Sequence, residues 1–199
     1  MKASLIWRTL FGALLLFEIC VGLKLFPIQP TFTVIGLIIT LVAVWIAVEY
    51  TEKLMRRSSV HDHHSITMAI LIPLTVYIDA IGDFCHLYTI LPNYDAYLHF
   101  FIPSVVTIWI WHVLRALYPT LSNRFYSFMA VAIMLAAGAL YEIEEYLEDV
   151  YTGSHRFGDA MDTGNDLTMD LLGPIIAIIC LNIFLKIRKQ YNNNRQQKK

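Results

Sequence analysis

Acidic side chains follow the hydrophobic segments of this sequence, at spacings that place several of them on one helix face. Glu142, Glu145 and Asp149 come directly after the apolar run 125–140, and on a helix they fall within about 60° of one another. A carboxylate in or beside a bilayer costs several kcal/mol unless it is protonated, paired or bound to a cation. The repetition of such acids is therefore the best indication of function in the sequence.

Other polar groups near apolar segments follow the same helical spacing: Asp79, Asp83 and His86; Asp95 and His99; and Asp162, Asp166 and Asp170. Carboxylates that share a small volume need a shared proton, a basic partner or a metal ion. Few basic residues accompany them, so a divalent cation is the simplest neutralising group. Oxygen ligands with one or two imidazoles suit Mg, Mn, Fe or Zn. We expect the metal ligands to be Asp83, His99, Glu142, Glu145, Asp166 and Asp170, with Glu142, Glu145 and Asp166 as the candidate catalytic residues.

Some of these residues have simpler interpretations. Asp95 and Asp166 could instead cap the helices that they begin. Glu144 and Glu148 fit a solvated turn at the membrane interface. The cluster His61-Asp62-His63-His64 has the composition of a chelating site, but its position in a polar loop favours a solvated segment.

The composition indicates a membrane protein. Of the 199 residues, 57% are hydrophobic and 16% charged, whereas globular domains carry roughly 25% charged residues. A bilayer crossing needs about 20 apolar residues, and six segments meet that length: 3–23, 32–49, 66–88, 98–117, 125–147 and 166–187. The sequence therefore predicts an all-α, polytopic bundle of six transmembrane helices with short loops. We expect one domain over 1–189 and a disordered, polar cytoplasmic tail over 190–199.

The distribution of basic residues predicts the orientation of the chain. With the N-terminus inside, thirteen Lys and Arg residues are cytoplasmic, and only Lys24 and Arg156 lie outside. Positive charge concentrates in cytoplasmic loops. We therefore expect both termini in the cytoplasm and the acidic helix ends on the outer side.

Two stretches of the sequence resemble a known family. The first is Asp95-Ala-Tyr-Leu-His99-Phe, and the second runs from Tyr141-Glu-Ile-Glu-Glu145 through Gly158-Asp159, Asp162-Thr163, Asp166 and Asp170 to Gly173. They resemble the YjdF-like bacterial inner-membrane proteins, a family of unknown function, and the similarity covers most of the last four expected helices. More distantly, the chain is similar to VanZ-type proteins, which are associated with glycopeptide resistance and the cell envelope. The resemblance implies a site embedded in the bacterial inner membrane.

These features favour a metal-assisted membrane enzyme with an outward-facing site that acts on a lipid-linked or envelope substrate. A proton- or cation-coupled small transporter is the main alternative, because intramembrane carboxylates also bind protons and cations. A non-catalytic accessory membrane subunit is the third. Nucleophile-elbow, Walker, Rossmann and His-Glu-x-x-His motifs are absent from the sequence, and no basic, aromatic groove suggests nucleic acid.

Overall fold

The computed structural model of the protein describes residues 2–57 and 64–197, and its regular elements there are all helices. In these residues the helices are α1 (Lys2–Gly22), α2 (Val34–Arg57), α3 (His64–Phe84), α4 (Leu87–Ile90), α5 (Tyr94–Leu117), α6 (Asn123–Thr152) and α7 (Ala160–Gln197). The prediction of an all-α fold is confirmed for this part of the chain. Helices suit apolar surroundings because they satisfy every backbone hydrogen bond within one segment.

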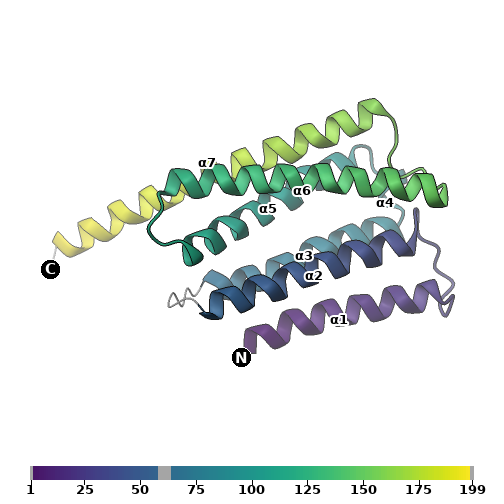
Figure 1. The fold of residues 1–199 in the computed structure, drawn as a ribbon, viewed down its shortest axis with the longest axis horizontal. Helices are drawn as coiled ribbons and strands as arrows, with labels where there is room; N and C mark the ends of the chain where they lie inside the picture. The colour runs from purple at the N-terminus through teal and green to yellow at the C-terminus, as the bar shows by residue number, and fades with distance from the viewer. Residues whose placement is uncertain (1, 58–63, 198–199) are drawn as a thin grey trace.

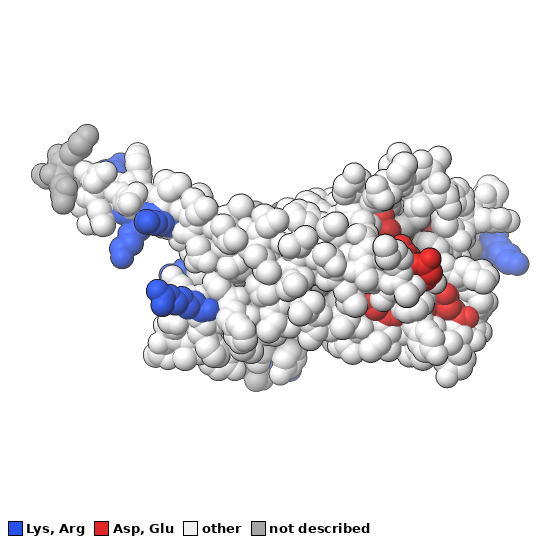
Figure 2. Space-filling model, turned by 90° about the horizontal axis from the view of Figure 1, so that it is seen from above, with Lys and Arg blue, Asp and Glu red and all other residues white. Residues whose placement is uncertain are grey.

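The six long helices run back and forth along one direction, so that both chain termini lie at the same end of the bundle (Figure 1). The four-residue α4 lies at the opposite end, in the connection between α3 and α5. Figure 2 shows that the Asp and Glu side chains visible on one face gather towards one end, and that most of the visible Lys and Arg side chains lie towards the other. The charge asymmetry read from the sequence is therefore also an asymmetry in space.

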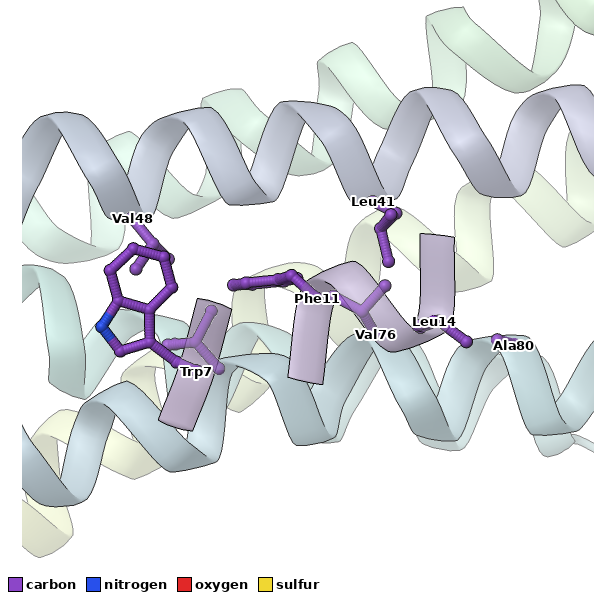
Figure 3. Packing of buried hydrophobic residues seen from close by; sticks show 8 residues of the cluster. Trp7, Phe11, Leu14, Leu41, Val48, Val76 and Ala80 are labelled. Atoms are coloured by element: carbon purple, nitrogen blue, oxygen red, sulfur yellow. The ribbon is translucent and has the colours of Figure 1, made fainter. Parts of the chain in front are cut away.

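Two groups of three helices form separate apolar cores. Helices α1, α2 and α3 bury the first core, which consists of Trp7, Phe11, Leu14, Leu41, Val48, Ile72, Val76 and Ala80 (Figure 3). Helices α5, α6 and α7 bury the second, which consists of Trp111, Tyr126, Ala130 and Ile178. The two groups join mainly where α3 packs against α5. Acidic residues from both groups meet near this junction.

Five of the described helices are long and apolar enough to cross a membrane: Ser4–Gly22, Val34–Met55, Tyr94–Leu117, Asn123–Thr152 and Ala160–Gln196. Many of the large side chains on their outer surfaces are exposed Leu, Ile and Phe residues, as lipid-facing helices require. A sixth crossing, by α3, stays a prediction.

The helix boundaries differ from the expected ones at several places, and the third and last helices show the physical reasons. The helix expected over 66–88 ends at Phe84, because His86 has a φ of 58°, a left-handed conformation that a right-handed helix cannot contain. The last helix begins at Ala160 and continues to Gln197, where a disordered tail was expected from residue 190. Each residue added to an existing helix gains a backbone hydrogen bond, so the polar tail extends α7 as an exposed helix.

Candidate functional site

A histidine surrounded by carboxylates lies where α5, α6 and α7 meet. His99 Nδ1 is 3.3 Å from Asp170 Oδ1 and 4.0 Å from Glu142 Oε1, and His99 Nε2 is 3.6 Å from Asp95 Oδ1. Ligand atoms of Asp95, His99 and Asp166 all lie within 4.8 Å of one another. We call these five residues the His99 centre. Helix α5 supplies Asp95 and His99 one turn apart, α7 supplies Asp166 and Asp170 one turn apart, and α6 supplies Glu142.

Several carboxylate oxygens of the His99 centre are buried without a partner. Within residues 2–57 and 64–197, both Glu142 oxygens, Asp166 Oδ1 and Asp170 Oδ2 lack a hydrogen-bond partner. An unpaired buried polar group costs free energy of the order of 1–3 kcal/mol, and more when it is charged. Asp95 is the most exposed member, at 32%, so it marks the side from which the centre can be reached.

Glycines allow the helices to approach closely at this centre. A Cβ on Gly138 of α6 would overlap the Asp170 carboxylate and lie 3.1 Å from Asp170 Cβ. A Cβ on Gly173 of α7 would overlap the backbone carbonyl of Phe100 on α5. The absence of a side chain at both positions therefore lets α7 pack directly against α5 and α6.

Two prolines change the backbone next to the same residues. Pro103 lies inside α5, four residues after His99, and Pro174 lies inside α7, four residues after Asp170. Proline has no N–H and removes the helical hydrogen bond to the carbonyl four residues earlier. The carbonyls of His99 and Asp170 thus lose their usual helical donors, which adds two hydrogen-bond acceptors beside an already oxygen-rich centre.

A buried arginine organises a second polar group, which we call the Arg156 cluster. Arg156 is only 5% exposed, donates from Nε to Glu145 Oε1 at 2.7 Å and from Nη2 to the Tyr141 hydroxyl, and lies 3.9 Å from Asp79 Oδ1. Its guanidinium packs over the rings of Phe32 and Tyr141, at 5.3 and 5.4 Å. Burial lowers the pKa of Arg156, but Tyr141, Asp79 and Glu145 raise it, and the net pKa lies well above that of an ordinary arginine. The cluster therefore contains a permanent positive charge.

The loop after α6 positions Arg156. Helix α6 ends at Gly153, which has a φ of 68°, a conformation that glycine adopts without strain. Asp149 then accepts hydrogen bonds from the Ser154 hydroxyl and from the backbone N–H groups of Arg156 and Phe157. These bonds fold the loop back along α6, so that the Arg156 side chain reaches the acids.

Four of the six expected ligands meet around one point: His99, Glu142, Asp166 and Asp170. The other two are engaged elsewhere. Glu145 binds Arg156, and Asp83 accepts a hydrogen bond from the Phe32 N–H at 2.9 Å through Oδ1. The contacts in the structure therefore bring four of the six expected residues together, and Glu145 and Asp83 each have a hydrogen-bond donor of their own. The roles of the other four as ligands stay predictions.

The structure overturns the simpler interpretations of three acidic residues, Asp95, Asp166 and Glu148. Asp95 is not a cap, because α5 begins at Tyr94 after Asn93, and Asp166 is not one either, because Asp159 accepts the hydrogen bonds at the start of α7. Glu148 is buried and accepts a hydrogen bond from Thr33 instead of facing solvent. The spacing of four between Asp95 and His99 was the signal that could have assigned Asp95.

Two further histidine-containing segments stand out in the sequence. His86 is exposed, and its Nδ1 lies 3.0 Å from the Thr31 hydroxyl. Residues 61–63 of the loop cluster lie outside the described residues, so its interpretation as a solvated loop stays a prediction.

The family described as "Predicted membrane protein (DUF2238)" matches residues 6–187. The chain belongs to this family. The match covers both three-helix groups and every residue of the His99 centre, and it establishes that the chain is a membrane protein. No curated protein and no solved structure matches the chain. The match is consistent with the expected membrane-protein family of unknown function, and it does not confirm the YjdF-like name.

Proposed function

We propose that this DUF2238 protein is a membrane enzyme that holds one divalent cation in the His99 centre. The observation that supports this best is the set of buried, unpartnered carboxylate oxygens next to His99. Four carboxylates around one imidazole carry excess negative charge, and the Arg156 guanidinium is already engaged by Glu145 and Asp79. A divalent cation neutralises such a set more economically than several separate protons.

The donor set fits a hard or borderline cation. Asp95, His99 and Asp166 offer the closest group of three ligand atoms, and Asp170 extends it on the Nδ1 side of the ring. Carboxylate oxygens with one imidazole suit Mg, Mn, Fe or Zn. A cation there would supply Lewis acidity to a substrate oxygen or to water. Glu142, which has no other partner among the described residues, is then the candidate general base.

The surroundings of the centre support a substrate that carries a lipid tail. Asp95 gives the centre its exposed side, and the nearby acids Asp159 and Asp162 are exposed as well. Large apolar or aromatic side chains on the same helix ends, such as Tyr97 and Ile143, are also exposed. A polar mouth next to lipid-facing side chains suits a lipid-linked or envelope substrate whose reactive group reaches the acids.

We infer the location of the site from the distribution of charge. The predicted topology assigns thirteen Lys and Arg residues to the side of the membrane that holds both termini, and the positive-inside rule makes that side the cytoplasm. The His99 centre then faces the outer side of a bacterial inner membrane, with both termini in the cytoplasm and six crossings between them.

A proton- or cation-coupled transporter is the second candidate. The observation that favours it is a buried, unpartnered acid on another helix, Glu18 of α1, outside the His99 centre. Protonatable acids at more than one position in the bundle suit the movement of protons.

Elemental analysis of protein purified without chelators tests the metal site. We expect about one divalent metal per chain in the wild type and loss of that metal in Glu142→Gln and Asp170→Asn, because each variant removes a negative charge from the His99 centre. His86→Ala is the matched control, since it removes an imidazole at the same end of the bundle but outside the centre.

The metal content decides between the two candidates. Wild-type protein that holds no stoichiometric metal would refute the metal-assisted enzyme and favour the transporter. Equal metal loss in His86→Ala would show that retention does not depend on the His99 centre. Each variant must also extract from membranes and elute like the wild type, so that metal loss reflects the site and not the fold.

A further inference from the structure

Glu18 is a fully buried acid in the apolar core of the first three-helix group. Its side chain is 0% exposed, and within residues 2–57 and 64–197 neither of its carboxylate oxygens has a hydrogen-bond partner. It lies on α1 one residue after Phe17, whose ring packs edge-on against Phe84 of α3 at 5.1 Å. No part of the His99 centre comes from α1 or α3, so Glu18 is a separate feature of the molecule.

The charged groups that face Glu18 are negative. Helix α1 packs against α2 and α3. On α3, Asp79 and Asp83 lie within electrostatic reach of Glu18, and Tyr77 is the other ionisable neighbour. On α2, no residue from Val34 to Val48 carries an ionisable side chain. Arg156 lies 3.9 Å from Asp79 and is shared with Glu145.

Asp79 and Asp83 accept hydrogen bonds from residues other than Glu18. Asp79 accepts from the Tyr88 hydroxyl, and Asp83 Oδ1 accepts from the Phe32 N–H. Asp83 Oδ2 is buried and has no partner in the described part of the chain. No donor to Glu18 occurs in the described residues, so an ionised Glu18 would add a third negative charge without a hydrogen bond, whereas protonation neutralises it.

We propose that Glu18 binds a proton at neutral pH and forms a proton-binding site in the core of the first three-helix group. A metal ion is a poorer occupant, because in the described residues the group of three metal-binding side chains with converging ligand atoms is Asp95, His99 and Asp166, and it includes neither Glu18 nor Asp83. Asp79 connects this site to the Arg156 cluster, so a proton gained or lost at Glu18 changes the balance of charge around Arg156. This site does not depend on the proposed metal chemistry.

Infrared difference spectroscopy of the full-length protein tests the proposal. Wild type and Glu18→Gln are compared at neutral pH in the same detergent. We expect the wild type to show a carbonyl band of a protonated carboxyl group that Glu18→Gln lacks, because the amide replaces only that acid. If Glu18→Gln instead lost carboxylate bands and kept the protonated-carboxyl band of the wild type, the proposal would be overturned.

Chemical modification of the wild type provides a second test that needs no variant. Dicyclohexylcarbodiimide reacts with protonated carboxyl groups: the acid proton moves to a reagent nitrogen, the carboxyl oxygen bonds to the central carbon, and the adduct rearranges to an N-acylurea with no leaving group. We expect mass spectrometry to find this adduct on Glu18 at neutral pH. The amount of adduct should fall about tenfold for each pH unit above the pH at which Glu18 loses its proton. Glu49, which is paired with Arg8 at 2.7 Å, is the ionised control. Adducts on other buried acids with none on Glu18 would contradict the proposal.

Discussion

Replacement of Arg156 by methionine should strongly destabilise the protein. The variant keeps an unbranched side chain between the rings of Phe32 and Tyr141 but removes the cation from Glu145 and Asp79. Removal of one partner of a buried ion pair costs about 3–5 kcal/mol, because the other charge stays buried and unpaired. Asp79 keeps its hydrogen bond from Tyr88, so most of the loss arises at Glu145. We therefore expect a loss near the lower limit, about 3 kcal/mol.

Arg8 offers a matched control for this measurement. Arg8 Nε lies 2.7 Å from Glu49 Oε1, the same distance as Arg156 Nε from Glu145 Oε1, but the Arg8 side chain is 47% exposed. Exposed ion pairs contribute about 0–1 kcal/mol, so Arg8→Met should change stability little. The comparison contrasts a buried with an exposed ion pair that have the same Nε–Oε1 distance.

The assay is the free energy of unfolding of each variant in detergent, measured by denaturant titration at neutral pH. The pKa of Arg156 is raised, so the stability that its charge contributes is fully present at every pH below the pKa of an unfolded arginine. The neutral range lies below that pKa, so the measurement records the full contribution. The double variant Arg156→Met/Glu145→Gln should recover part of the loss, because it leaves no unpaired charge at Glu145. Equal stability of Arg156→Met and Arg8→Met would refute this account of the Arg156 cluster.

Two further predictions concern packing and topology. Gly138→Ala should destabilise the protein by about 1–3 kcal/mol through overpacking and should weaken metal retention, since the new methyl group displaces Asp170. Gly164→Ala on α7 meets no atom within 4 Å and should be neutral or stabilise the helix by up to about 1 kcal/mol. Equal stability of these variants in unfolding titrations would contradict the close approach of α6 and α7. Reporter fusions at the C-terminus should be active only with a cytoplasmic reporter enzyme, and activity of a periplasmic reporter at Lys199 would reverse the proposed orientation.

Local features that the sequence contains directly were predicted correctly. Long apolar runs with few charged residues identified a helical membrane protein. Each such run, as a helix, makes its backbone hydrogen bonds within itself and presents apolar side chains to the lipid. The helical spacing also identified His99, Glu142, Asp166 and Asp170 as residues that face one another. Both inferences need only periodicity and the cost of a lipid-facing charge.

The partners of the remaining acids were decided by the tertiary structure. Glu145 has nearly the same helical phase as Glu142, yet Arg156 folds back from a loop and donates a hydrogen bond to Glu145. Asp83 follows the periodicity of the acid face, but the Phe32 N–H before α2 occupies one of its oxygens. Glu18 lies in an apolar run of the sequence, and only the packing of α1 against α2 and α3 buries it completely. Periodicity fixes the direction of a side chain around its own helix, whereas the charge or donor that it meets depends on which helix or loop packs there.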